Sequence, residues 1–298
     1  MLTDHHIRAV VRLALAEDSP WGDVTSAAFI PEATAATAAL VAREPGILSG
    51  GAVFRAAFVE LDPTLAVEVM PDGTDFEVGA TLATVSGRAR SILGAERVAL
   101  NLVQRMSGIA TLTARYVAEV DGTSARVVDT RKTTPGLRAL ERHAVRCGGG
   151  HNHRFSLSDA VLAKDNHLAV LTASGRSITD VLLEVRAGLS HTTHVEVEVD
   201  RIDQIEPVLA GGVDTIMLDN FTLDELREGV ALVAGRALIE ASGNVSLETI
   251  GAIAATGVDV ISVGALTHSV RALDLGLDIV VEESVVQEAV VEEPVVGD

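Results

Sequence analysis

The chain has 298 residues, of which 48% are hydrophobic and only 3% aromatic, and its formal net charge is -19. This length allows two domains or one large α/β domain. So acidic a balance argues against nucleic acid as the main partner, because phosphate binding calls for basic surface over much of one face. Cys147 is the only cysteine, which excludes an intrachain disulfide.

The sequence also lacks membrane and export signals. No apolar run reaches the roughly 20 residues of a membrane span. The N-terminal segment has neither the basic start nor the small-residue cleavage site of a signal peptide. We therefore expect a cytoplasmic protein without a membrane partner.

The first third of the chain alternates helical and extended patterns. Residues 4–17 and 52–61 have helical periodicity, and residues 37–43 and 65–70 alternate as strands do. This order predicts a small α+β domain. Residues 90–120 are again helical, and Ser107-Gly108 interrupts the pattern. We predict a domain boundary at this interruption, between residues 107 and 108.

The second half repeats a strand-then-helix unit. Short apolar segments occur at 126–130, 160–167, 194–200, 215–220, 237–243 and 260–266. From Val199 to Asp219, Ser242 and Gly264, the steps are about 20, 23 and 22 residues, the length of a tight βα unit. Such repeats predict a parallel sheet, either closed as a barrel or open and doubly wound.

The segment 194–200 favours the barrel. Its valines alternate with Glu196, Glu198 and Asp200, whereas a central strand of an open parallel sheet is normally apolar on both faces. In a barrel the valines can face the helices while the acids face the interior or its mouth. The alternative is an edge strand with a solvated acidic face.

The end of the chain differs from the repeats. Residues 273–279 alternate with a strict period of two, which predicts an antiparallel strand within 271–281 that returns to the N-terminal domain. Residues 282–298 contain acids, valines and no base, and we expect a disordered acidic tail.

One basic segment, residues 126–167, stands out in the acidic chain. It holds eight Arg and Lys against four Asp and Glu, a net of +4. Clustered cations repel one another unless an anion neutralises them, so this segment predicts a site for a small anion, which Arg can grip through two parallel hydrogen bonds.

A metal site in this segment is less favoured, because arginines would repel the cation. Its residues would be His143, Cys147, His151 and His153. We interpret the spacing of Arg138, Arg142 and Arg146 mostly as a solvated helix face.

Polar and small residues follow the predicted strands, at the barrel end where ligands bind. Glu198 and Asp219 close adjacent strands and suit Mg²⁺ carried on a diphosphate, held directly or through substrate and water. They could instead pair with the basic segment, and Asp219 could cap the next helix. Segments 242–244 and 262–265 lie where barrels bind phosphate, although glycine after a strand is also an ordinary turn.

The segment DTRKTTPGLRALERHAVRCGGGHNHR, followed by KDNH, closely resembles the quinolinate phosphoribosyltransferase family. The resemblance extends through EDSPWGDVTS, NLVQRMSGIATLT, VEVEVD, IMLDN, EASGN and ISVGALTHS, and so covers nearly the whole chain except its acidic end. Phe155, Ser156 and Ser158 depart from the family pattern, which leaves the wall of the site uncertain.

The resemblance implies a fold and an activity. The fold is an N-terminal α/β sandwich domain over 1–107 and an incomplete parallel α/β barrel over 108–270, in a head-to-tail homodimer or a higher oligomer. The enzyme would be a pentosyltransferase of NAD biosynthesis. Its substrates would be quinolinate and phosphoribosyl pyrophosphate, with Mg²⁺ as cofactor, and its products nicotinate mononucleotide, CO₂ and pyrophosphate.

The resemblance also implies roles for individual residues. The quinolinate carboxylates would contact Arg131, His153, Arg154 and Lys164, together with Arg97 of the partner subunit. The catalytic residues would be Lys132, Lys164, Glu198 and Asp219, with Lys132, Glu198 and Asp219 around the ribose, diphosphate and metal. The 5′-phosphate cradle would be Ser242, Gly243, Asn244, Ser262 and Gly264.

Three other functions stay open at this point. A related transferase could use nicotinate, which needs only one carboxylate contact. A binding or transport-associated relative could keep the fold without the reaction. A barrel could also serve an unrelated phosphosugar.

Overall fold

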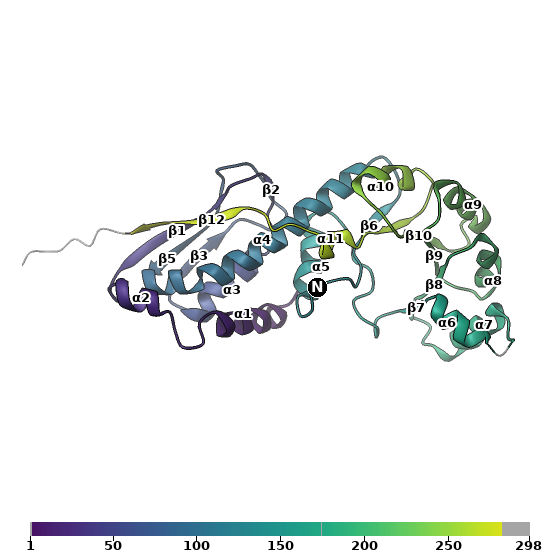
Figure 1. The fold of residues 1–298 in the computed structure, drawn as a ribbon, viewed down its shortest axis with the longest axis horizontal. Coiled ribbons are helices and arrows are strands. Elements are labelled where there is room, and N and C mark those ends of the chain that lie inside the picture. Colours follow the sequence, from purple (N-terminus) through teal and green to yellow (C-terminus); the bar gives the residue numbers. More distant parts are fainter. Residues whose placement is uncertain (1, 174, 282–298) are drawn as a thin grey trace, which may run out of the picture.

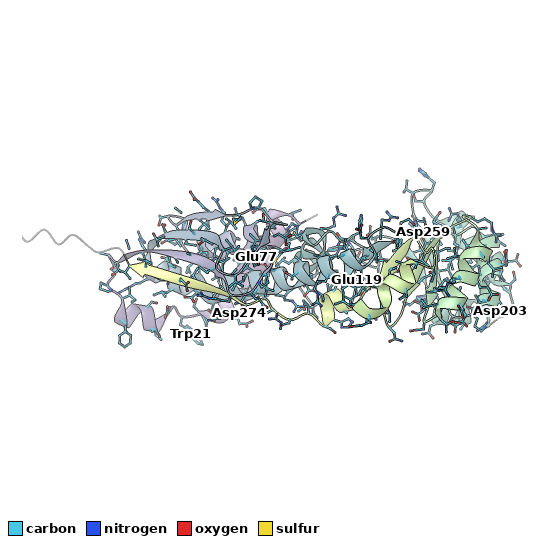
Figure 2. The ribbon with its side chains drawn as sticks, turned by 90° about the horizontal axis from the view of Figure 1, so that it is seen from above. Trp21, Glu77, Glu119, Asp203, Asp259 and Asp274 are labelled. Carbon is cyan, nitrogen blue, oxygen red and sulfur yellow. The ribbon has the colours of Figure 1, made fainter. Side chains whose placement is uncertain are left out.

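The computed structural model describes residues 2–173 and 175–281, and the predicted disordered tail at 282–298 lies outside them. An N-terminal lobe and a barrel lobe lie end to end, joined by one long helix (Figures 1 and 2). Within the described residues, no helix combines the length and apolar character that crossing a membrane requires.

A four-stranded antiparallel sheet, in the order β12-β1-β5-β3, forms the N-terminal lobe. Every second residue of β1 is buried, as the period of a strand requires. Helices α3 and α4 pack on the sheet, and Phe54 and Phe58 of α3 are fully buried. The elements are α1 (Asp4–Asp18), α2 (Val24–Phe29), β1 (Ala35–Ala42), β2 (Gly46–Ile47), α3 (Gly51–Leu61), β3 (Ala66–Val69), β4 (Asp75–Phe76) and β5 (Thr81–Arg88).

Strand β12 (Leu275–Val281) brings the end of the described chain back to this lobe. It pairs antiparallel with β1 from Ala36↔Val281 to Ala42↔Leu275. Figure 1 shows it running from the barrel lobe to the far end of the sheet. The period-of-two pattern of this segment favours such a strand, because its leucines face one side.

Helix α4 (Ala89–Glu119) passes through Ser107 and Gly108 without a break, so the interruption predicted there is wrong. These small residues instead let other segments approach the helix. A Cβ added at Gly108 would lie 2.2 Å from the carbonyl oxygen of Arg271. The Ser107 hydroxyl accepts the N–H of Ser49 at 3.1 Å. The helix therefore joins the lobes as one continuous rod.

Six parallel strands form the barrel lobe in the order β6-β11-β10-β9-β8-β7. The edge strands β6 and β7 do not pair with each other, so the predicted incomplete parallel barrel is confirmed. The elements are β6 (Arg126–Val128), α5 (Arg138–Cys147), β7 (Val161–Ala163), α6 (Asp165–Thr172), α7 (Ile178–Gly188), β8 (Val195–Val199), η1 (Ile202–Gln204), α8 (Ile205–Ala210), β9 (Thr215–Asp219), α9 (Leu223–Val233), β10 (Leu238–Ser242), α10 (Leu247–Ala254), β11 (Val260–Ser262) and α11 (Ala265–His268).

Strand β8 lies between β7 and β9, which rules out the edge-strand alternative for its acidic face. Val195, Val197 and Val199 are buried, and Glu196 is only 4% exposed. The acidic face of β8 therefore begins inside the barrel and reaches solvent only at Asp200.

Two strands are shorter than the sequence predicted, because a helix begins inside each of the predicted ranges, 160–167 and 260–266. Strand β7 stops at Ala163, and α6 starts at Asp165. Strand β11 stops at Ser262, and α11 starts at Ala265. Lys164 and Gly264 therefore lie at strand-to-helix junctions, where backbone groups are available to a ligand.

We predict that Gly108→Ala lowers the melting temperature. The new methyl group meets backbone at 2.2 Å, and overpacking of this kind typically costs about 1–3 kcal/mol. Gly188→Ala in α7 is the matched control, because its Cβ would meet nothing within 4 Å. Thermal unfolding of both variants checks this, and equal melting temperatures would contradict the close approach at Gly108.

Candidate functional site

The strand register places predicted site residues on the inner face of the barrel, near the carboxyl ends of the strands. Asp219 of β9 pairs in register with Ser242 of β10, and Ser262 of β11 pairs with Val128 of β6. Residues in register share a face of the sheet. Lys164 Nζ lies 2.5 Å from Glu198 Oε2, so the end of β8 also meets the segment after β7. Glu198 therefore pairs with Lys164 of the basic segment, which the sequence analysis gave as the alternative to Mg²⁺ binding.

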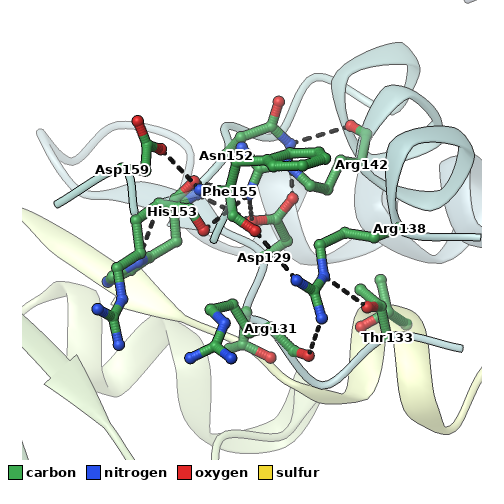
Figure 3. Close-up of polar contacts among 12 residues, drawn as sticks. Asp129, Arg131, Thr133, Arg138, Arg142, Asn152, His153, Phe155 and Asp159 are labelled. Atoms are coloured by element: carbon green, nitrogen blue, oxygen red, sulfur yellow. Dashed lines mark hydrogen bonds and ion pairs between the residues drawn. The ribbon is translucent and has the colours of Figure 1, made fainter. Parts of the chain in front are cut away.

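Asp129 organises the basic segment from its position just after β6. Its carboxylate is fully buried and accepts hydrogen bonds from Asn152 Nδ2 at 2.6 Å and from the His153 N–H at 2.8 Å (Figure 3). Arg142 lies 3.3 Å away. Burial raises the pKa of Asp129, although Arg142 and the two hydrogen bonds oppose that rise.

Two of the three arginines spaced by four do not form a solvated helix face, so that interpretation is wrong for them. The Arg142 side chain is only 12% exposed and donates to the carbonyl oxygen of His153 at 2.7 Å. Arg138 donates to the carbonyl oxygen of Arg131 at 3.5 Å (Figure 3). Only Arg146 is exposed as predicted. These two guanidiniums bind backbone carbonyl groups of the loops that carry the site.

Arg131 and Arg154 are neighbouring cations with unused donors. The Nε atom of each is buried and has no hydrogen-bond partner in the described part of the chain. Burial and the charge of Arg131 lower the pKa of Arg154. Two like charges held together with free donors form a site for an anion, and a planar carboxylate matches the fork of each guanidinium.

The His153 ring points toward two buried glutamates inside the barrel. Its Nε2 lies 3.1 Å from Glu196 Oε2 and 3.4 Å from Glu240 Oε2. Its Nδ1 accepts the backbone N–H of Arg154 at 2.7 Å. Both ring nitrogens are thus engaged within the chain, and His153 offers no free N–H to the predicted quinolinate position in this conformation.

This cluster of His153, Glu196 and Glu240 retains a proton. Burial disfavours charge on His153, but the bonds to the two glutamates raise its pKa to about 10. Burial also raises the pKa of Glu240. Because Nδ1 accepts the Arg154 N–H, the ring N–H that lies between the two carboxylates is the one on Nε2.

The late strand ends bring together the predicted phosphate cradle. Gly243 has a φ of +95°, and a Cβ there would lie 2.2 Å from Asn220 Oδ1. Asn244 Nδ2 donates to the same oxygen at 3.1 Å. A Cβ at Gly264 would lie 3.2 Å from Lys132 Cδ. Position 243 thus favours glycine for two reasons, its left-handed backbone and the close approach of Asn220. The Lys132 side chain lies beside Gly264, at the junction of β11 and α11.

Asp219 does not cap the following helix, so that alternative is wrong. Thr222 is the N-cap of α9 and forms a capping box with Glu225. The Asp219 carboxylate instead accepts from Asn220 Nδ2 at 2.7 Å. It is therefore oriented along the end of β9 and can serve a ligand.

Arg97 lies apart from this arrangement. It is exposed on α4, and no contact described in residues 2–173 and 175–281 joins it to the other predicted site residues. Arg105, two turns later, does reach the site lobe: it binds Glu141 at 2.6 Å, Thr134 Oγ1 at 2.8 Å and the Thr267 carbonyl oxygen at 2.9 Å. Sequence reasoning missed Arg105, and only its place on the polar side of a long helix could have suggested it.

The histidines and the cysteine considered as a metal site from the sequence do not lie in one cluster. His143 Nε2 contacts Asp72 Oδ2 at 2.7 Å and Cys147 Sγ at 3.4 Å. His153 belongs to the separate glutamate cluster. His143 therefore joins α5 to the N-terminal lobe, and its hydrogen bonds to Asp72 and Cys147 raise its pKa to about 10.

A cavity of about 750 Å³ lies in the barrel on the side away from the predicted rim. It includes Glu196, Glu240, His153 and Arg154, together with residues at strand starts such as Thr215. It does not include Lys132, Lys164 or Asp219. Among the described residues, His153 and Arg154 are the predicted substrate-binding residues that also line this cavity.

Comparison with known proteins covers both lobes. Family models for the N-terminal and C-terminal domains of quinolinate phosphoribosyl transferase match residues 23–107 and 109–278. Nicotinate-nucleotide pyrophosphorylase (carboxylating) of Mycobacterium leprae is 45% identical over 282 residues, which cover 91% of this chain and 96% of that protein. A probable nicotinate-nucleotide pyrophosphorylase (carboxylating) of Bacillus subtilis is 42% identical and covers 88% of this chain and 90% of its own length.

Solved structures agree with these matches. The structure of NadC from Streptococcus pyogenes has a TM-score of 0.90 and 39% identity, and the match covers 95% of this chain and 99% of that one. The nicotinate-nucleotide pyrophosphorylase of Francisella tularensis has a TM-score of 0.87 and 36% identity over 94% of this chain and 98% of that one. With both domain models matched in order, the chain belongs to the quinolinate phosphoribosyltransferase family.

Proposed function

We propose that this protein transfers the phosphoribosyl group of phosphoribosyl pyrophosphate to quinolinate with loss of CO₂. The products are nicotinate mononucleotide, CO₂ and pyrophosphate, as in NAD biosynthesis. The observation that carries this proposal is the pair of adjacent guanidiniums, Arg131 and Arg154, with buried and unused Nε donors. A ring with two neighbouring carboxylates supplies the negative charge that this pair needs.

Quinolinate binding would use the cationic side of the rim. Arg131 and Arg154 would grip the carboxylates, and Lys164 would add a third cation beside them. Lys164 is held by Glu198 at 2.5 Å, so its ammonium is positioned before the substrate arrives. Orientation of the ring nitrogen toward the ribose carbon is the main contribution expected from these contacts.

The phosphoribosyl donor would occupy the opposite side of the rim. Backbone and side-chain donors at Ser242, Gly243 and Asn244, with Ser262 and Gly264, would cradle the 5′-phosphate. Lys132, which lies beside Gly264, would approach the diphosphate. Positive charge near the departing pyrophosphate lowers the barrier as negative charge develops on it.

Glu198 and Asp219 would hold Mg²⁺ at the rim. Their donors are carboxylate oxygens at the ends of adjacent strands, and hard cations prefer such ligands. Because Glu198 already binds Lys164, we propose that it contacts the ion through water or substrate. Mg²⁺ bound with the diphosphate would neutralise the leaving group.

Loss of CO₂ would depend on the same cations. When the 2-carboxylate leaves as CO₂, the electron pair of the broken C–C bond remains at C2 of the pyridinium ring, and a nearby ammonium would stabilise it until C2 takes up a proton from water. Lys164 and Lys132 are the residues we propose for this role. Both side chains are exposed after the ends of their strands, β6 and β7.

We also propose a cytoplasmic homodimer in which Arg97 of the partner subunit completes each site. Arg97 is exposed and remote from the rim of its own chain. The N-terminal lobe also exposes large apolar side chains around α2, and Trp21 is 94% exposed (Figure 2). Exposed tryptophan is typical of protein interfaces.

Pyrophosphate and CO₂ release tests the proposed reaction. With quinolinate and phosphoribosyl pyrophosphate, we expect both products in equal amounts, and their formation should stop when a chelator removes Mg²⁺. Pyrophosphate without CO₂ would point to a different acceptor, such as nicotinate. If neither pyrophosphate nor CO₂ is released, the proposed transferase reaction is ruled out.

We predict that Arg131→Ala abolishes turnover with little loss of stability. Each charge-assisted hydrogen bond to a carboxylate contributes about 1.5–3 kcal/mol, which is roughly a 10- to 100-fold loss of binding. The unused Nε of Arg131 means that folding loses few contacts. Arg227→Ala in α9 is the control, since that exposed side chain pairs only with Asp224. Steady-state rates and melting temperatures check this, and a fully active Arg131→Ala enzyme would contradict the assignment.

Mixed dimers test the shared site. We expect Arg97→Ala and Lys164→Ala proteins to be inactive alone. After random exchange of subunits, half of the dimers are mixed and each rebuilds one site of two, so about a quarter of the sites should recover. Activity measured after unfolding and refolding the mixture gives the answer. Absence of recovery would argue against a site shared between subunits.

A further inference from the structure

Two glutamates inside the barrel have no role in the reaction proposed above. Glu196 of β8 and Glu240 of β10 are 4% and 3% exposed, and each directs Oε2 at His153 Nε2. The Oε1 atom of each is buried without a partner among the described residues. Burial of two carboxylates costs free energy that an apolar pair would not. Contacts with His153, and for Glu240 also a hydrogen bond with Ser262, compensate for this cost.

The His153 ring passes this contact to the backbone of the site. With Nε2 held between the glutamates, Nδ1 accepts the Arg154 N–H at 2.7 Å. The His153 N–H donates to Asp129 at 2.8 Å. The two peptide units that flank the His153 Cα are therefore both fixed, the first by a buried carboxylate and the second by the clamped ring.

Arg154 depends on that peptide for its direction. Beyond the backbone, its NH1 donates to the Ala160 carbonyl oxygen at 2.9 Å, and its Nε remains free for a ligand. Arg131 repels it. Without the ligand, the guanidiniums would separate unless the backbone held them, so the clamp on His153 opposes this repulsion.

A metal ion is the alternative occupant of this cluster. The donor atoms of His153, Glu196 and Glu240 lie within 4.8 Å of one another. A neutral histidine that binds metal through Nε2 must carry its proton on Nδ1. The Arg154 N–H already points at Nδ1. The geometry therefore suits an Nε2–H donor shared by two carboxylates better than a metal.

We propose that Glu196 and Glu240 are positioning residues for quinolinate binding, which hold His153 and thereby aim Arg154 at the substrate carboxylate. This proposal rests on the proposed function. In this proposal His153 supports the anion site by fixing the backbone of Arg154, and it does not itself contact the substrate. It also assigns a purpose to the carboxylates that line the barrel cavity.

Isothermal titration of quinolinate, without the second substrate, tests the proposal. We expect the Glu196→Gln/Glu240→Gln protein to bind quinolinate at least tenfold more weakly than the unmodified protein. Binding of phosphoribosyl pyrophosphate with Mg²⁺ is compared in the Glu196→Gln single variant, where it should stay within twofold, because Glu240, unlike Glu196, also hydrogen-bonds Ser262 of the proposed phosphate cradle. In turnover, the KM for quinolinate should rise while that for the second substrate does not. A merely structural defect would weaken both.

Glu228→Gln is the matched control, because it makes the same chemical change on the exposed face of α9. Quinolinate affinity within twofold of the unmodified protein in the double variant would overturn the proposal. If the double variant does not fold, the two single variants replace it, and unchanged affinity in both would have the same meaning. Failure of the unmodified protein to bind quinolinate would instead overturn the proposed function, and this proposal with it.

Discussion

The buried carboxylate of Asp129 is the constraint on which the anion site depends. It sits where β6 ends and takes hydrogen bonds from Asn152 and His153, with Arg142 beside it. Those contacts fold a long basic segment back on itself, so that cations distant in sequence face one another. A carboxylate in such a place is stable only with these partners, since burial alone raises its pKa. The cationic anion-binding site is thus organised by the buried carboxylate of Asp129.

The alternation of parallel strands explains how the remaining chemistry is sorted. Side chains on the inner face change along each strand from buried to accessible, so Glu196 serves the interior while Glu198 reaches Lys164 at the rim. In the sheet order, the proposed phosphate cradle lies on β10 and β11, and the proposed quinolinate cations come from segments that follow the two edge strands, β6 and β7.

Sequence patterns predicted the repeats and the inner acidic face, because periods of two and the βα spacing depend on local geometry. The strand spacing placed several rim residues at strand ends, and the resemblance to the family added the roles that we propose for them. What failed depended on tertiary contact: Gly108 looked like a break but permits a close approach by Arg271, and the arginines of α5 looked solvated but bind carbonyl groups. Glu240 was missed because a lone acid in an apolar strand gives no sign of its partner.

The pairing of β1 with β12 makes the first lobe depend on the last part of the described chain. Strand β1 has β5 on one side and β12 on the other. During synthesis, which proceeds from the N-terminus, β1 presents unpaired backbone donors and acceptors until β12 has been made. A chain cut short before residue 275 would keep that edge open and be prone to aggregation. Completion of the N-terminal sheet is therefore coupled to synthesis of the last described strand, β12.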